Sequence, residues 1–303
     1  MLTSRRKFLQ SSALTVTGIA FSPALACSEK KNQEEIKEVE KITALQLYSV
    51  RNEMRDDPVQ TLNRLAEMGY THVEHASYVN HRFYGWTAAE FKTILDNSGL
   101  LIPSGHVVLE EFHWDETKND FTDDWKKTVE NAAFLGQEFL ISPSMDESIQ
   151  STYNNLMRFM VIFNKCGELC NASGLKFGYH NHDFEFSKTL NGAKIFDLIA
   201  TNTDADKVVL QLDIGNMYLA GAMAENVINQ YPGRFLTIHV KDMVKTGNKA
   251  SAYESTVLGD GILEPRKITD LAKDTGTTLF VIEQEAYQGD EVVGILKIFF
   301  LWQ

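Results

Sequence analysis

The sequence is poor in cysteine, which limits the chemistry it can use. Only three of its 303 residues are cysteines, and no Cys-x-x-Cys pair is present, so a thiolate zinc site is not predicted. Cys166 and Cys170 lie four residues apart in a helical pattern, a spacing that suits a disulfide poorly. We therefore expect two buried thiols.

Basic residues are also scarce. The chain has 29 Lys and Arg against 41 Asp and Glu, and its formal net charge is −12. Such a surface repels a phosphodiester backbone, so nucleic acid is excluded as an expected partner. No Gly-x-Gly-x-x-Gly turn follows the first strand-like run, which disfavours dinucleotide binding. Without a glycine-rich phosphate cradle, an unphosphorylated substrate is the better expectation.

The first residues have the pattern of an export signal. Residues 4–9 read SRRKFL, a twin-arginine pattern, and an apolar stretch at 13–26 follows that is too short to span a membrane. Cys27 follows Ala-Leu-Ala, which resembles a bacterial lipobox, so residues 1–27 are either a lipoprotein signal with a lipid anchor at Cys27 or an ordinary cleaved signal. Residues 28–41, rich in Glu and Lys, are expected to be a solvated tether. The mature protein would be periplasmic or anchored to a membrane.

From residue 42 onward, β-rich runs alternate with helical patterns, which indicates a parallel sheet. We expect a single (β/α)8 barrel domain over residues 42–303 because eight runs are present. The runs cover residues 43–50, 71–75, 101–107, 138–142, 176–180, 207–213, 235–241 and 278–283. Helical patterns at 58–68, 88–96, 153–172 and 266–273 each end near a glycine. The last segment, 290–302, is expected to form the eighth helix, and its apolar end is either packed inside or an association surface of an oligomer.

Several runs end in polar or ionisable residues. Because all strands of such a barrel point the same way, these side chains should meet at its C-terminal rim. Asp213, His239 and Glu283 end three successive runs, and two carboxylates with an imidazole suit Mn, Zn, Co or Fe(II). The sequence therefore predicts a divalent-metal site. The other rim residues are Glu74, His75, His106, His180 and His182.

Five motifs carry a family resemblance. They are LQLYSVR at 45–51, FGYHNHDFEF at 177–186, LDIGN at 212–216, IHVKD at 238–242 and VIEQE at 281–285. In this order, over residues 43–285, they resemble the xylose isomerase-like sugar phosphate isomerase/epimerase superfamily.

The resemblance implies a metal held by residues from strands five to eight. Three of the four ligands carry over as Asp213, His239 and Glu283. The fifth-strand position has His180 in place of glutamate, so the fourth ligand is either His180 or Glu185 from the following loop. Asn216 stands where the family often has a substrate-binding histidine.

The chemistry implied is removal of a proton next to a carbonyl, leaving an enediolate. His180 and His182 are the candidate bases because imidazole titrates near neutrality. Lys241 would either stabilise the enediolate or pair with Glu285 or Asp213. The remaining substrate contacts expected from the rim are Glu74, His106, Tyr48 and Asn216. The loop at 242–263 would either cover the site or be a surface excursion.

Three functions fit the sequence. The first is a metal-dependent isomerase or epimerase of an unphosphorylated sugar or keto-sugar. The second is β-elimination, either in a lyase or hydrolase of 3-keto-glycosides or in a dehydratase of keto-polyols. The third is a sugar-binding lipoprotein without catalysis.

Overall fold

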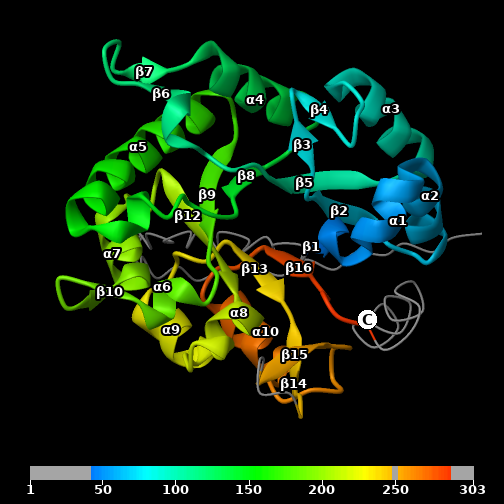
Figure 1. Ribbon diagram of the computed structural model, residues 1–303. Coiled ribbons are helices and arrows are strands. Elements are labelled where there is room, and N and C mark those ends of the chain that lie inside the picture. Colours follow the sequence, from blue (N-terminus) through cyan, green and yellow to red (C-terminus); the bar gives the residue numbers. More distant parts are fainter. Residues whose placement is uncertain (1–41, 248–251, 288–303) are drawn as a thin grey trace, which may run out of the picture. The chain divides into compact units, whose positions relative to one another are not determined.

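The computed structural model describes residues 42–247 and 252–287. Its centre is a closed barrel of eight parallel strands in the order β1-β16-β13-β12-β9-β8-β5-β2 (Figure 1). The expected fold is confirmed. The barrel strands are β1 (Ile42–Gln46), β2 (His72–His75), β5 (Leu101–His106), β8 (Phe139–Ser142), β9 (Lys176–His180), β12 (Val208–Asp213), β13 (Thr237–Val240) and β16 (Leu279–Ile282).

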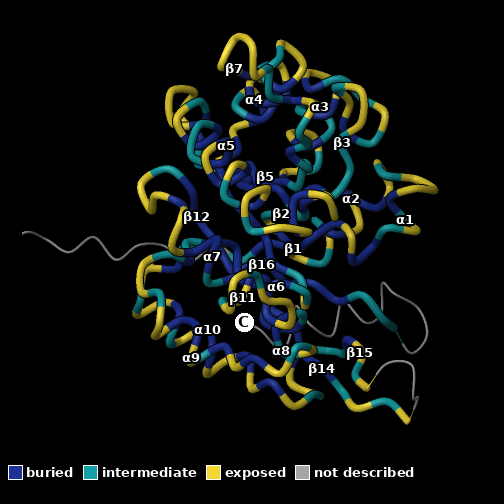
Figure 2. The backbone as a smooth tube through the Cα atoms, turned by 60° about the vertical axis from the view of Figure 1, so that its left-hand side comes forward, coloured by how far each residue is buried: buried dark blue, intermediate teal, exposed yellow. Residues whose placement is uncertain are grey.

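Helices surround the barrel, and each buries one face against it. Buried residues therefore lie toward the interior and exposed residues toward the outside (Figure 2). Thr87, Thr122 and Thr152 cap three of them through their side chains. The helices are α1 (Arg51–Asp56), α2 (Pro58–Glu67), α3 (Ala88–Ser98), α4 (Asp123–Phe134), α5 (Tyr153–Ala172), α6 (Phe184–Ser187), α7 (Ile195–Asn202), α8 (Ile214–Leu219), α9 (Ala224–Gln230) and α10 (Pro265–Asp274), with short 3-10 turns η1 (Leu47–Val50), η2 (Glu111–His113) and η3 (Ile149–Ser151).

The first strand is shorter than the sequence predicts. It ends at Gln46 rather than at residue 50, because the Gln46 side chain accepts the backbone N–H of Tyr48 and turns the chain into η1. The seventh barrel strand is likewise limited to Thr237–Val240. By contrast, α5 begins and ends where its pattern predicts.

Small antiparallel hairpins follow several strands. The expected loop at 242–263 contains one of them, β14 (Asp242–Lys245) with β15 (Tyr253–Thr256). The Asp242 carboxylate anchors this segment by accepting the backbone N–H groups of Met243, Gly259, Gly261 and Leu263. The other hairpins are β3 (Tyr78–Val79) with β4 (Arg82–Phe83), β6 (Trp114–Asp115) with β7 (Asp120–Phe121), and β10 (Thr189–Leu190) with β11 (Ala193–Lys194).

The barrel interior has an apolar plug beneath a polar layer. Side chains alternate along each strand, so every second residue points inward. Gly178 makes room for the plug, since a Cβ there would meet the Ile141 and Val209 side chains. The plug consists of Ala44, Phe139, Ile141, Val209, Leu279 and Val281, all buried.

Cys166 and Cys170 are buried free thiols, as expected. Among the residues that the structure describes, no helix combines the length and apolar character that crossing a membrane requires. The predicted signal, the tether and the segment at 290–302 lie outside the described residues.

Candidate active site

The polar layer lies directly above the plug, at the C-terminal ends of the strands. Its residues occupy inward-facing positions of the strands, as Gln211 follows Val209 by two and Asp213 follows Gln211 by two. Residues far apart in the sequence therefore meet in one buried cluster. Its buried members are Gln46, Glu74, Ser104, His180, Gln211, Asp213, Thr237 and His239, with Lys241 and Glu283 just beyond their strands, and His106 is a partly buried member.

Glu74 is fully buried at the base of this layer. Its Oε1 accepts hydrogen bonds at 2.6 Å from Gln46 Nε2 and His239 Nε2, and its Oε2 accepts them from Ser104 Oγ at 2.5 Å and Gln211 Nε2 at 2.9 Å. Burial raises the pKa of Glu74, but His106 and His239 outweigh that effect and hold it well below its ordinary value. Glu74 was expected to contact substrate at the rim, but both its oxygens are used within the protein.

His239 lies between two carboxylates. Its Nε2 is 2.6 Å from Glu74 Oε1 and its Nδ1 is 2.7 Å from Glu283 Oε2. Burial lowers the pKa of His239, whereas Glu74 and Glu283 raise it, to about 10. A neutral imidazole has only one N–H, so the second contact requires either another proton or a metal ion between nitrogen and oxygen.

Lys241 is the other buried cation. Its Nζ lies 2.8 Å from Asp213 Oδ2 and 3.0 Å from Glu283 Oε2, and it also contacts Glu285. Burial lowers the pKa of Lys241, but these carboxylates, Asp213 foremost, keep it well above its ordinary value. Lys241 thus makes the ion pairs with Asp213 and Glu285 that the sequence left as one of two alternatives.

The charges in this cluster do not balance without a further cation. Glu74, Asp213 and Glu283 are buried carboxylates, and the Lys241 ammonium and the protonated His239 offset two of them, which leaves one negative charge. A metal ion that displaces the His239 proton would face two negative charges. Unbalanced charge in a buried site is strongly unfavourable. A divalent ion would supply the missing charge, so the donor set fits a metal of the kind expected.

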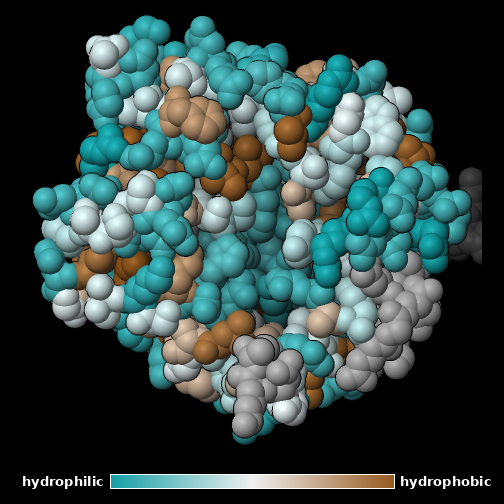
Figure 3. Space-filling view, in the orientation of Figure 1, coloured by the Kyte–Doolittle hydropathy of each residue, from teal (hydrophilic) through white to brown (hydrophobic). Residues whose placement is uncertain are grey.

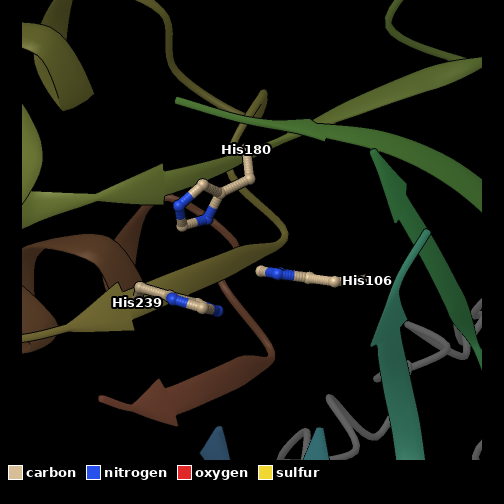
Figure 4. Close-up of side chains that lie close together, drawn as sticks. All are labelled: His106, His180 and His239. Carbon is tan, nitrogen blue, oxygen red and sulfur yellow. The ribbon is translucent and has the colours of Figure 1, made fainter. Parts of the chain in front are cut away.

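Within the described part of the chain, two groups of potential metal ligands have their ligand atoms within 4.8 Å of one another. One is Asp213, His239 and Glu283, and the other is His106, His180 and His239. The histidines come from β5, β9 and β13 and point toward one another (Figure 4). The structure therefore brings together the three predicted ligands, with His180 beside them: its Nε2 is 3.5 Å from Asp213 Oδ2.

A cavity of about 450 Å³ opens over this cluster. One face of the molecule is hollowed at its centre, and hydrophilic residues line the hollow (Figure 3). The cavity is within the size range of small-molecule sites, roughly 300–1,000 Å³. Its lining includes the predicted residues Tyr48, His106, His180, His182, Asn216 and Glu283, together with Glu285, Tyr78, Val79 and Pro143.

The lining residues His182 and Asn216 differ in their hydrogen bonding. His182 is partly buried, and burial lowers its pKa; its Nδ1 has no hydrogen-bond partner among the described residues. Asn216 donates its side-chain amide to Asp213 Oδ2 at 3.0 Å. His182 thus lines the cavity with a buried, unpartnered Nδ1, whereas Asn216 also holds a predicted ligand.

Glu185 was one of two candidates for the fourth ligand, and the structure does not bring it to the cluster. Its Oε1 accepts the Tyr179 hydroxyl at 2.5 Å and its Oε2 accepts the His182 backbone N–H at 2.8 Å. Tyr179 faces the helix layer, where its ring packs near Phe163 of α5. Glu185 turns toward that layer because the short α6 begins directly after the histidines.

Sequence reasoning missed four residues of the polar layer: Gln46, Ser104, Gln211 and Thr237. A signal was present, since three of them precede a predicted rim residue by two positions. Ser104 precedes His106, Gln211 precedes Asp213, and Thr237 precedes His239. Polar residues inside otherwise apolar strands, at the inward parity of a predicted site residue, would have identified them.

Comparison with known proteins gives concordant matches. The family model of the xylose isomerase-like TIM barrel matches residues 62–296. A sugar phosphate isomerase/epimerase from Parabacteroides distasonis is 26% identical, with a TM-score of 0.71 over 88% of this chain and 94% of that one. A xylose isomerase-like TIM barrel protein from Mycobacterium smegmatis in complex with magnesium is 17% identical, with a TM-score of 0.61 over 87% and 96% of the two chains.

Inosose dehydratase from Lacticaseibacillus casei is 24% identical over 160 residues, which are 48% of this chain. The chain spans about half the length of that relative, 52%.

Proposed function

We propose a function for this chain, which belongs to the xylose isomerase-like TIM barrel family. In this proposal it is a divalent-metal-dependent isomerase or epimerase of an unphosphorylated sugar or keto-sugar. The observation that carries this proposal is the convergence of Asp213, His239 and Glu283 beside a cavity that also contains His182. A metal held by these three residues would polarise a substrate carbonyl and its neighbouring hydroxyl, which makes the proton on the adjacent carbon more acidic.

His182 is the base in this proposal. Its imidazole lines the cavity, so a substrate carbon can approach the ring, whereas its Nδ1 is buried and has no hydrogen-bond partner among the described residues. Because its pKa lies below the ordinary value, the imidazole is neutral at pH 7 and able to accept a proton. Returning that proton to the former carbonyl carbon isomerises the sugar. Epimerisation requires a second acid, on the opposite face of the enediolate, to protonate the carbon that lost the proton.

The remaining lining residues support binding of an uncharged sugar. Tyr48 is 46% exposed and offers an aromatic ring to the apolar face of a sugar ring. Among the described residues, no Lys or Arg lines the cavity. The nearby Lys241 ammonium is already paired with Asp213, Glu283 and Glu285, and the Arg51 guanidinium lies over the Tyr48 ring. These features favour an unphosphorylated substrate.

A second function, dehydration by β-elimination, is favoured by the similarity to inosose dehydratase and by His180 at the position where the family places glutamate. Proton removal is the same in both cases. In elimination, the electron pair of the broken C–H bond expels a hydroxyl group from the next carbon, and that group leaves as water after protonation.

Hydrogen exchange in D2O tests the shared step. Purified protein loaded with Mn or Zn is incubated with free ketoses, inososes and 3-keto-glycosides, and NMR follows the substrate C–H signal. We expect solvent deuterium at the carbon next to the carbonyl, with an epimer or isomer as product; an unsaturated product or a released aglycone would identify elimination instead. His182→Asn should slow exchange about 10²- to 10⁴-fold.

The control is His72→Asn at the other end of β2, which should exchange at the wild-type rate. Sugar binding without exchange, unchanged by Asp213→Ala and His239→Ala, would make the protein a binding protein and end the enzyme proposal.

A further inference from the structure

The orientation of two buried amides is fixed by what surrounds them. Gln46 Oε1 accepts the Tyr48 backbone N–H at 3.1 Å, so the Gln46 amide group that faces Glu74 must be its NH2. Ser104 donates its hydroxyl to the other oxygen of Glu74. Glu74 is therefore an acceptor on both oxygens.

Gln211 takes its orientation from Glu74. Its Nε2 lies 2.9 Å from Glu74 Oε2 and 3.2 Å from Thr237 Oγ1, which leaves its Oε1 facing the histidines. That oxygen is 2.7 Å from His106 Nε2 and 2.9 Å from His180 Nδ1. An amide oxygen has no proton to give, so both of these nitrogens carry one.

The same reasoning sets the tautomer of His239. Its Nε2 donates to Glu74 Oε1, because Glu74 is an acceptor. The lone pair of a neutral His239 is then on Nδ1, which faces Glu283, and the lone pair of His180 is on Nε2, which faces Asp213. Both lone pairs are directed to the side of the cluster where the two carboxylates lie.

From this network we infer that Glu74 and Gln211 are positioning residues that fix the tautomers of His239 and His180, and that His180 Nε2, rather than Glu185, is the fourth metal ligand. This inference rests on the metal dependence of the proposed function. The ligand set is then His180, Asp213, His239 and Glu283, with one protein oxygen holding the far nitrogen of each histidine. Such outer partners orient metal-binding histidines and make them better donors.

The network also decides between the two candidate metal groups. A metal held by the three histidines would have to bind nitrogens that face Glu74 and Gln211, which are the ones that carry protons (Figure 4). A protonated nitrogen has no lone pair to share. The three-histidine group is therefore a set of hydrogen-bond donors, and the metal position is on its other side.

The experiment measures metal affinity and histidine tautomers rather than turnover. Co(II) and Zn(II) affinities are obtained by competition with a chromophoric chelator. Glu74→Gln should lower affinity about 10- to 100-fold, the range seen when an outer partner of a metal-binding histidine is lost. Gln211→Met, which leaves Glu74 in place and removes the acceptor of His180 Nδ1, should lower it at least about 10-fold.

Glu185→Gln is the matched control. It removes the ionisable group of a side chain as buried as Glu74, just beyond the end of β9, and should leave affinity unchanged. His180→Ala should change the visible Co(II) absorption, because a ligand is lost. If Glu185→Gln weakens binding while Glu74→Gln does not, the inference is wrong.

The wild-type protein provides a test that no folding defect can obscure. In the Zn(II)-loaded protein, 15N NMR of the histidines should show protonated Nδ1 for His180 and protonated Nε2 for His239. The opposite tautomer at His180 would overturn the inference. Wild-type protein that binds neither metal would instead overturn the proposed metal-dependent function, so the two failures are distinguishable.

Discussion

The Lys241 ammonium lies 2.8 Å from Asp213 Oδ2, and both side chains are buried. Removing a buried partner leaves a charge uncompensated, which costs about 3–5 kcal/mol. We therefore expect Lys241→Met to lower the free energy of unfolding by that amount in the presence of a chelator. Divalent metal should restore more stability to this variant than it adds to the wild type, because the metal has more charge to offset. Thermal unfolding with and without metal measures both effects.

Asp213 also caps α8. Substitutions can therefore distinguish this structural role from the role of its charge. Its Oδ1 accepts the backbone N–H groups of Gly215 and Asn216. Asp213→Asn keeps an oxygen for this cap and removes the charge, and Lys241 keeps Glu283 and Glu285 as partners. Chelator-treated protein should therefore unfold close to the wild-type midpoint, while metal affinity falls by more than about 100-fold. Asp213→Ala should lose the cap as well, at about 1 kcal/mol more. Unchanged metal affinity in Asp213→Asn would exclude this residue as a ligand.

The raised pKa of Glu185 predicts that the stability of the protein depends on pH. Burial raises its pKa to about 7 from 4.5, so between these values the folded protein binds more protons than the unfolded chain. Stability therefore falls as pH rises through this range, by up to ~3 kcal/mol. Glu185→Gln removes the titration, so its stability relative to wild type should improve from pH 4.5 to pH 8. Urea unfolding at several pH values measures this difference, and a constant difference would contradict the assignment.

Asp242 holds the segment that follows β13. It accepts four backbone N–H groups, and hydrogen bonds to a charged group are worth about 1.5–3 kcal/mol each, though not additively. Asp242→Ala should therefore destabilise the protein by more than about 3 kcal/mol in urea unfolding. Asp260→Ala, an exposed neighbour in the same segment, is the control and should change stability by less than about 0.5 kcal/mol.

The export signal remains a prediction from residues 1–27. Replacing Arg5 and Arg6 together by Lys should keep the protein in the cytoplasm, which cell fractionation detects. If Cys27 carries a lipid, Cys27→Ala should move the protein from the membrane to the soluble fraction. A double lysine variant that still reaches the periplasm would exclude the twin-arginine route.

The sequence predicted what depends on strand order and strand ends. Asp213, His239 and Glu283 each follow an apolar run, and a parallel barrel brings such positions together whatever their separation in the chain. The eight strands were identified because β-rich runs alternate with helical patterns along the chain. Their bounds were less accurate where a side chain turns the backbone, as Gln46 does.

The sequence could not predict which polar atoms meet inside the barrel. Glu74 lies near the end of β2, as a rim residue would. Its burial depends on the register of the neighbouring strands, which places Gln46 of β1 and Ser104 of β5 beside it. Glu185 was considered as a ligand because its carboxylate suits a hard cation. Its actual direction follows from a turn and from the Tyr179 hydroxyl, which no local pattern reports.

Among the described residues, the hydrocarbon plug lies beneath the polar layer on one side and the cavity opens over it on the other. Low-dielectric walls focus an electric field toward the open side. Before metal binds, the field of the unbalanced negative charge is therefore directed outward along the barrel axis, where it attracts divalent cations and repels phosphate esters. The apolar plug thus contributes to selecting divalent cations over phosphate esters at the cavity entrance.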